Sequence, residues 1–246
     1  MRGPGAKFAG MLSASAFGVL LEHPSSPVRA GLDEALARRA LMGLAMGLTA
    51  VALIHSPLGK RSGAHMNPAV TLTFLRLGKV ARPDAALYVL AHFAGGVAGM
   101  GLAALVFGGL LADPGVNYVV TLGEHGPWVA FAAEVAISFL LMSVVLRVSS
   151  SPRLERWTGA CAGTLVALYI TFEAPLSGMS LNPARSFGSA LAAGLWLDFW
   201  VYLAAPLLGM GLAAVVYTRS RRVPPVHCAK LHHVNRYRCI FCGANS

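Results

Sequence analysis

Two copies of one short motif carry the residues of this chain that are best suited to handling a solute. Residues 62–72 read SGAHMNPAVTL and residues 177–187 read SGMSLNPARSF, so that Asn67 and Asn182 stand 115 residues apart, each followed by Pro-Ala. Asparagine is a preferred helix N-cap and proline is preferred at the first helical position. Each triplet therefore predicts the start of a helix. The triplets are Asn67-Pro68-Ala69 and Asn182-Pro183-Ala184.

The apolar runs after the two triplets are too short to cross a membrane. Residues 68–77 and 183–193 are each about 10 residues long, or roughly 15 Å of helix, which is half of a ~30 Å hydrocarbon core. Paired half-helices in two hydrophobic halves indicate a site at the middle of the membrane. Their N-termini present unpaired N–H groups and positive dipole ends, and the asparagine NH₂ groups add hydrogen-bond donors. Such a site passes neutral solutes and rejects cations.

The composition requires lipid around most of the chain. Hydrophobic residues make up 56% of its 246 residues and charged residues 12%, and the mean hydropathy is +0.62, whereas soluble domains carry about 25% charged residues. The apolar runs predict an all-α membrane protein with six transmembrane helices and two half-helices in an inverted repeat. The predicted spans are 8–21, 40–58, 85–112, 128–146, 157–176 and 195–217. The channel domain is predicted at 1–218, with repeats at about 8–112 and 127–218, and a basic tail containing Cys and His at 219–246.

The basic residues predict the orientation of the chain and account for its net charge of +10. With both termini cytoplasmic, four of the 20 Lys and Arg residues fall outside: Arg29, Arg38, Arg39 and Arg185. The other sixteen fall inside, as the positive-inside rule requires. We therefore expect a multi-pass protein of the cell membrane with both ends cytoplasmic. The basic excess then reflects this topology, and no nucleic-acid partner is expected.

The paired Asn-Pro-Ala boxes, the second followed by Arg185, resemble those of the aquaporin (major intrinsic protein) family, and a bacterial-type member is expected. The resemblance implies a channel for water or small neutral solutes that assembles as a homotetramer in the lipid bilayer. It also implies an outer constriction formed by Met46, Ile170, Met179 and Arg185, with Gly47 as an alternative to Met46. This rim has neither the aromatic and His of water channels nor the two aromatics of glycerol channels. Water, glycerol and other small solutes therefore all stay open as substrates.

The resemblance assigns supporting roles to other polar residues in the apolar runs. Glu134 matches a carboxylate that holds a box loop in the family, which favours a structural role over a proton relay. The matching Glu of the first span is missing, which suggests a shortened first helix or a longer N-terminus upstream of Met1. His65 is expected to line the inner vestibule, where it would titrate near its ordinary pKa of about 6.5. His92 is expected to be a packing residue within the bundle.

The tail offers soft ligands outside the channel. Its candidate metal ligands are Cys228, His232, Cys239 and Cys242, within a segment that also holds His227 and His233. Thiol and imidazole groups in a reducing compartment favour zinc over a disulfide. The channel itself is expected to need no cofactor, so that zinc in the tail, a redox-sensitive cysteine pair and an unstructured tail are the alternatives.

Other classes of function find less support in the residues. No nucleophile–base pair in a pocket is recognisable, so an enzyme is not expected. A secondary transporter also uses inverted repeats and broken helices, but the intramembrane acidic residues are scattered. A metal-sensing membrane protein with a vestigial pore is the remaining alternative. Within the channel class, a glycerol-type facilitator is the alternative to a water channel.

Overall fold

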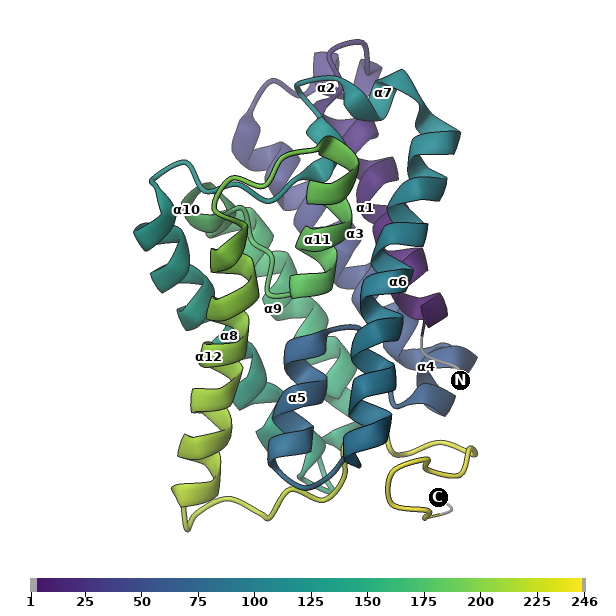
Figure 1. Ribbon diagram of the computed structural model, residues 1–246, viewed down its shortest axis with the longest axis vertical. Coiled ribbons are helices and arrows are strands. Elements are labelled where there is room, and N and C mark those ends of the chain that lie inside the picture. Colours follow the sequence, from purple (N-terminus) through teal and green to yellow (C-terminus); the bar gives the residue numbers. More distant parts are fainter. Residues whose placement is uncertain (1–3, 245–246) are drawn as a thin grey trace.

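The computed structural model describes residues 4–244, which fold into a bundle of helices without a strand among them (Figure 1). The prediction of an all-α fold is confirmed. Three pairs of long helices pack most closely: α1 with α6, α3 with α9, and α8 with α12. The first and the last pair each lie within one half of the chain, whereas α3 and α9 come from different halves. The long helices are α1 (Pro4–Glu22), α3 (Ala35–His55), α6 (Arg82–Phe107), α8 (Pro127–Ser149), α9 (Thr158–Phe172) and α12 (Phe199–Arg219).

Four of these long helices, α3, α6, α8 and α12, are long and apolar enough to cross a membrane by themselves. The other two differ from the predicted spans. Helix α1 has 19 residues, five more than the apolar run 8–21. Helix α9 has only 15 residues, or roughly 22 Å, because the predicted span 157–176 is broken after Phe172.

Prolines explain two breaks that the apolar runs concealed. Pro57 begins the short helix α4 (Pro57–Ser62), whose N-cap Ser56 accepts a hydrogen bond from the backbone N–H of Gly59. The second short helix, α10 (Ala174–Ser177), carries Pro175 in its first turn. Ser56, the residue before Pro57, is extended with a ψ of 159°, as expected before a proline, and α3 ends there. Pro175 has no N–H with which to continue the hydrogen-bond pattern of α9. The predicted spans 40–58 and 157–176 were therefore too long at their C-terminal ends.

The repeat is visible in the backbone between the short helices and the half-helices. Gly63 ends α4 and Gly178 ends α10, both in the left-handed region with φ of 77° and 81°. The chain then enters α5 (Pro68–Arg76) and α11 (Pro183–Ala193), which are the two predicted half-helices. They point toward each other from opposite ends of the bundle, with their N-termini meeting near its middle (Figure 1).

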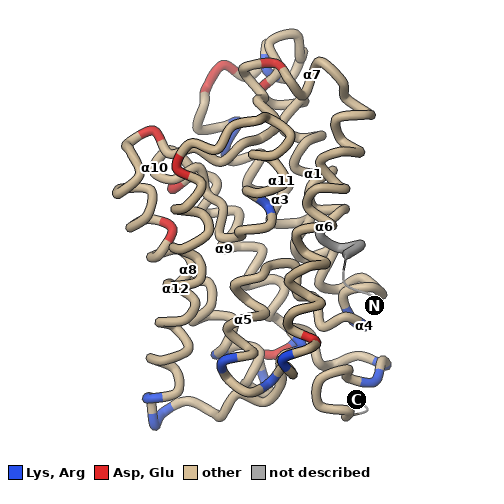
Figure 2. The backbone as a smooth tube through the Cα atoms, viewed as in Figure 1, with Lys and Arg blue, Asp and Glu red and all other residues tan. Residues whose placement is uncertain are grey.

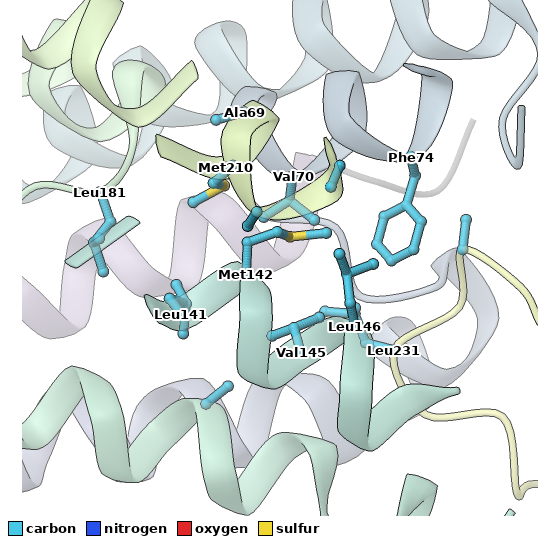
Figure 3. Packing of buried hydrophobic residues seen from close by; sticks show 14 of the residues in the cluster. Ala69, Val70, Phe74, Leu141, Met142, Val145, Leu146, Leu181, Met210 and Leu231 are labelled. Atoms are coloured by element: carbon cyan, nitrogen blue, oxygen red, sulfur yellow. The ribbon is translucent and has the colours of Figure 1, made fainter. Parts of the chain in front are cut away.

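Glycines let the long helices approach closely in the interior. A Cβ on Gly47 of α3 would lie 2.5 Å from the carbonyl oxygen of Gly163 in α9, and a Cβ on Gly163 would lie 2.6 Å from that of Gly47. Small residues therefore allow the two helix backbones to pack tightly at this reciprocal contact. Around α5, apolar side chains of α8 and α12 complete the largest buried cluster (Figure 3).

The C-terminal tail, residues 220–244, folds back under one end of the bundle, which we term the tail end (Figure 1). The loops with α2 (Pro27–Gly31), α7 (Gly109–Ala112) and η1 (Asn117–Val119) lie at the opposite, or far, end. Most Lys and Arg residues gather at the tail end, and most Asp and Glu residues gather toward the far end (Figure 2).

Candidate pore

A cavity of about 370 Å³ passes between the two half-helices. Glu22 and Arg39 line it toward the far end, Asn67 and Asn182 line it in the middle, and Leu231 of the tail lines it at the tail end. At about 30 Å³ per water molecule, this volume holds roughly a dozen waters. The cavity therefore joins the residues that the sequence singled out in both halves.

The two asparagines cap their half-helices and also tie the two loops together. Asn67 Oδ1 accepts from the backbone N–H of Ala69 at 2.9 Å, and Asn182 Oδ1 accepts from that of Ala184 at 3.2 Å. The predicted N-caps are therefore present. Each NH₂ group also donates to the opposite loop: Asn67 Nδ2 to Leu181 O at 2.7 Å, and Asn182 Nδ2 to Met66 O at 2.9 Å.

These crossed hydrogen bonds correct one expectation about the asparagines. The sequence predicted both NH₂ groups as donors into the pore. Each group has two N–H bonds, and one of them is spent on the opposite loop. A single N–H per asparagine is left for a solute, and the same contact fixes the spacing of the two helix N-termini.

The side chains predicted for the constriction all line the cavity. Met46 comes from α3, Ile170 from α9, Met179 from the loop before α11, and Arg185 from the first turn of α11. Gly47, the alternative to Met46, is instead buried against the carbonyl of Gly163. The geometry therefore favours Met46 over Gly47.

Arg185 is held by a loop that the sequence reasoning passed over. Its guanidinium donates to Thr121 Oγ1, which lies in the connection between the two halves. Thr121 also pairs with Ser186 Oγ at 2.9 Å, and Ser186 pairs with Ser180 Oγ at 2.6 Å. Thr121 stands in a segment without a recognisable motif, so no pattern in the sequence marked it.

Glu134 fixes the loop before α11 from inside the bundle. Its Oε1 accepts from the backbone N–H of Ser180 at 2.5 Å and from Ser177 Oγ at 3.2 Å, and its Oε2 accepts from the N–H of Leu181 at 2.8 Å. Tyr202 adds a hydrogen bond from its hydroxyl to Ser177 O at 2.7 Å. The carboxylate is fully buried, and its contacts match the expected structural role.

His65 holds the loop before α5, and it does not line the vestibule as predicted. Only 1% of its surface is exposed, because the tail covers it. Its Nε2 lies 2.7 Å from Ala229 O, and its Nδ1 lies 3.1 Å from Thr71 Oγ1. His92 Nε2 lies 2.8 Å from His65 O, which confirms the predicted packing role of His92 within the bundle.

The tail gathers a cluster of soft ligand atoms that differs by one residue from the predicted set. Ligand atoms of Cys228, His233, Cys239 and Cys242 all lie within 4.8 Å of one another. His232, which was predicted as a member, instead packs its ring against His55 at a centroid distance of 4.4 Å. Burial, followed by the nearby positive charges, lowers the pKa of His232 to about 4.

The sequence and the fold of this chain are both matched by known proteins. A sequence profile of the family described as Major intrinsic protein matches residues 8–217. This chain belongs to that family. Aquaporin TIP4-4 of Zea mays is 38% identical over 207 residues, covering 77% of this chain and 80% of that protein.

A second relative and one solved structure extend the comparison. The probable aquaporin NIP-type of Nicotiana alata is 34% identical over 177 residues, covering 71% of this chain but only 63% of that relative. Both relatives are plant proteins and give no support to the expected bacterial type. The X-ray structure of the aquaglyceroporin from Plasmodium falciparum aligns with a TM-score of 0.68 at 20% identity, covering 89% of this chain and 95% of that chain. The fold is therefore the aquaporin fold.

Proposed function

We propose that this major intrinsic protein is a passive channel for water and small neutral solutes. The observation that carries the proposal is that Asn67, Asn182 and Arg185 line the same cavity. Two positive helix ends and a guanidinium face this space, and Glu22 is the one carboxylate among its lining residues. Water or a hydroxyl group accepts hydrogen bonds from such donors, whereas a cation meets a repulsive potential.

The two asparagines and Arg185 act on the solute at different depths of the path. The remaining N–H of each asparagine donates to a passing solute at the middle of the membrane. Arg185 lines the far half of the path, where it donates to the solute and repels protons carried as hydronium. An uncompensated Arg at membrane depth is costly unless it faces a wet cavity, and Arg185 is only half-buried.

The rim supports a broader solute range than water alone. Met46, Ile170 and Met179 supply apolar walls, and methionine side chains are flexible enough to adapt to a solute. Arg185 then remains the main donor at this level. The names of the plant relatives, which are both aquaporins, support water as a solute. The apolar, flexible rim supports glycerol-type solutes as the second candidate.

The location proposed is a cell membrane, with the tail end on the cytoplasmic side. The concentration of Lys and Arg at the tail end (Figure 2) supports this orientation. Both termini are then cytoplasmic. A homotetramer, with one pore in each subunit, is proposed from the family resemblance, and chemical cross-linking in membranes tests it.

Stopped-flow light scattering on proteoliposomes tests the channel, with water and glycerol permeability recorded side by side. We expect water flow well above that of protein-free vesicles, with glycerol flow above the same control if the rim is broad. Equal flow with and without protein, in the presence and absence of a metal chelator, would contradict the channel.

Replacing Arg185 tests the exclusion mechanism. Arg185→Val is expected to keep water flow and to raise proton leakage, which a pH-sensitive dye inside the vesicles reports. Arg185→Lys keeps the charge and serves as the matched control, with leakage near that of the wild type. Proton leakage unchanged in Arg185→Val would show that the guanidinium does not exclude protons.

A further inference from the structure

The cluster in the tail has the dimensions of a tetrahedral metal site. Cys228 Sγ and Cys239 Sγ are 3.3 Å apart, and His233 Nε2 and Cys242 Sγ are also 3.3 Å apart. A zinc ion with Zn–S bonds of about 2.3 Å places its ligand atoms roughly 3.8 Å from one another. The four atoms, all within 4.8 Å of each other, therefore need only small shifts to surround one ion.

The donor set selects the class of metal. Three thiols and one imidazole suit zinc and similar soft or borderline ions, whereas magnesium and calcium prefer oxygen ligands. All three cysteines are free thiols. The turn that presents Cys239 and Cys242 is closed by hydrogen bonds from Gly243 N to Cys239 O and from Cys239 N to Ala244 O, at 3.0 and 2.9 Å. The ligands are therefore held on an ordered turn.

The segment between the ligands is docked on the loop that leads into α5. Ala229 O lies 2.7 Å from His65 Nε2, and Leu231 N donates to Gly63 O at 3.1 Å. Phe241, which lies between two ligands, stacks on the ring of His65 at a centroid distance of 5.2 Å. A Cβ on Gly63 would lie 2.3 Å from the Phe241 ring, so this docking requires glycine at position 63.

The docked segment also reaches the cavity. Leu231 lies three residues after Cys228 and two before His233, and its side chain forms part of the cavity wall at the tail end. It is buried against the cluster of apolar residues from α5 and α8 (Figure 3). A ligand that holds Cys228 and His233 in place therefore also holds the Leu231 side chain at this end of the cavity.

We propose that the four-residue cluster binds one zinc-class ion, and that the bound ion clamps the tail over the tail-end mouth of the channel. The inference rests on the proposed channel function. The metal ties both ends of the Cys228–His233 segment to the Cys239–Cys242 turn. Phe241 is then held against His65, and Leu231 is held in place as a plug. Loss of the metal releases this clamp, and permeability rises.

Metal content tests the site independently of transport. Full-length protein purified with Zn²⁺ and dialysed is expected to retain about one zinc ion per chain, and a Cys239→Ser/Cys242→Ser variant is expected to retain none. Cys161→Ser removes a thiol in α9 away from the cluster, so it is the matched control and is expected to keep the zinc. His233→Ala should lose zinc whereas His232→Ala should keep it. No zinc in the wild type, or a Cys228–Cys239 disulfide in its place, would overturn the site.

Permeability then tests the clamp. In wild-type proteoliposomes, the membrane-permeant chelator phenanthroline is expected to raise water flow severalfold, and restored Zn²⁺ should lower it. The Cys239→Ser/Cys242→Ser variant should show the higher water flow both with the chelator and with Zn²⁺. Leu231→Ala keeps all four ligands, so it should retain zinc and still show the higher water flow. Equal flow with and without bound zinc would overturn the clamp, whereas a lack of flow in every variant and condition would instead contradict the proposed channel.

Discussion

The loop before α11 and the loop before α5 are copies of one another, yet they are held by different parts of the chain. Glu134 in α8 accepts two backbone N–H groups of the loop before α11 from inside the bundle. The only acidic residue of α1 is Glu22, which ends that helix and pairs with Arg38. The loop before α5 is instead joined through His65 and Gly63 to the C-terminal tail.

The difference shows that the repeat is symmetric in backbone but not in support. A buried carboxylate is a permanent part of the fold, because leaving its partners without an acceptor is costly. The tail instead packs on the loop before α5 from the tail end, and under the proposed clamp it leaves this loop while the bundle stays folded. The half of the channel next to the tail is therefore the half that is suited to regulation, and variants in the two loops should differ in the size and kind of their effects.

The largest effect is expected from removing the internal support. Glu134→Ala leaves two buried backbone N–H groups and the Ser177 hydroxyl without their acceptor, at a cost of about 1–3 kcal/mol for each group. We expect a strong loss of folded protein, measured as thermal unfolding in detergent by size-exclusion chromatography. Glu124→Ala, at an exposed carboxylate, is the control and should unfold like the wild type. If both variants were equally stable, the support assigned to Glu134 would be wrong.

A smaller effect is expected where the tail supports the other loop. His65→Ala and Phe241→Ala are each expected to lower the free energy of unfolding by about 1–3 kcal/mol. Because the two rings stack, their effects should be non-additive by about 0.5–1.5 kcal/mol in a double-mutant cycle. Phe187→Ala in α11 is the control partner for Phe241→Ala, and that pair should be additive. If the effects of His65→Ala and Phe241→Ala were additive, Phe241 of the tail would not support the loop before α5 through His65.

The smallest effects test the part of the support that the two halves share. Tyr88 donates its hydroxyl to Ser62 O, and Tyr202 donates to Ser177 O, both at 2.7 Å. Tyr88→Phe and Tyr202→Phe should lower the free energy of unfolding by similar amounts, about 1 kcal/mol each. The Tyr169 hydroxyl has no hydrogen-bond partner within residues 4–244, so Tyr169→Phe should cost nothing. A large difference in unfolding free energy between Tyr88→Phe and Tyr202→Phe would show that the two tyrosine hydrogen bonds do not support their loops equally.

Much of this fold could be predicted because the decisive signals are local. Asn-Pro at each box specifies an N-cap and a first turn, and the predicted 183–193 half-helix ends where α11 does. Long apolar runs located the other helices. They did not reveal α4 and α10, since hydropathy alone does not register that a proline ends one helix and begins the next.

The site was predicted less completely, because its remaining features depend on contacts across the chain. Nothing near Thr121 indicates that it meets Arg185, which follows 64 residues later. The burial of His65 depends on a tail more than 160 residues away. The choice of His233 over His232 as the neighbour of the cysteines depends on which ring the docked tail turns toward α3, and adjacent histidines look alike in a sequence.

Water permeability of two tryptophan variants tests most directly whether the cavity between the half-helices is the transport path. Met46 lines the cavity, whereas Leu48, two residues along the same helix, is 59% exposed on the outer surface. Stopped-flow light scattering in the presence of chelator is expected to show wild-type flow in Leu48→Trp. In Met46→Trp, the same measurement should give flow near that of protein-free vesicles, because the indole fills the path. Equal flow in the two folded variants would contradict the account.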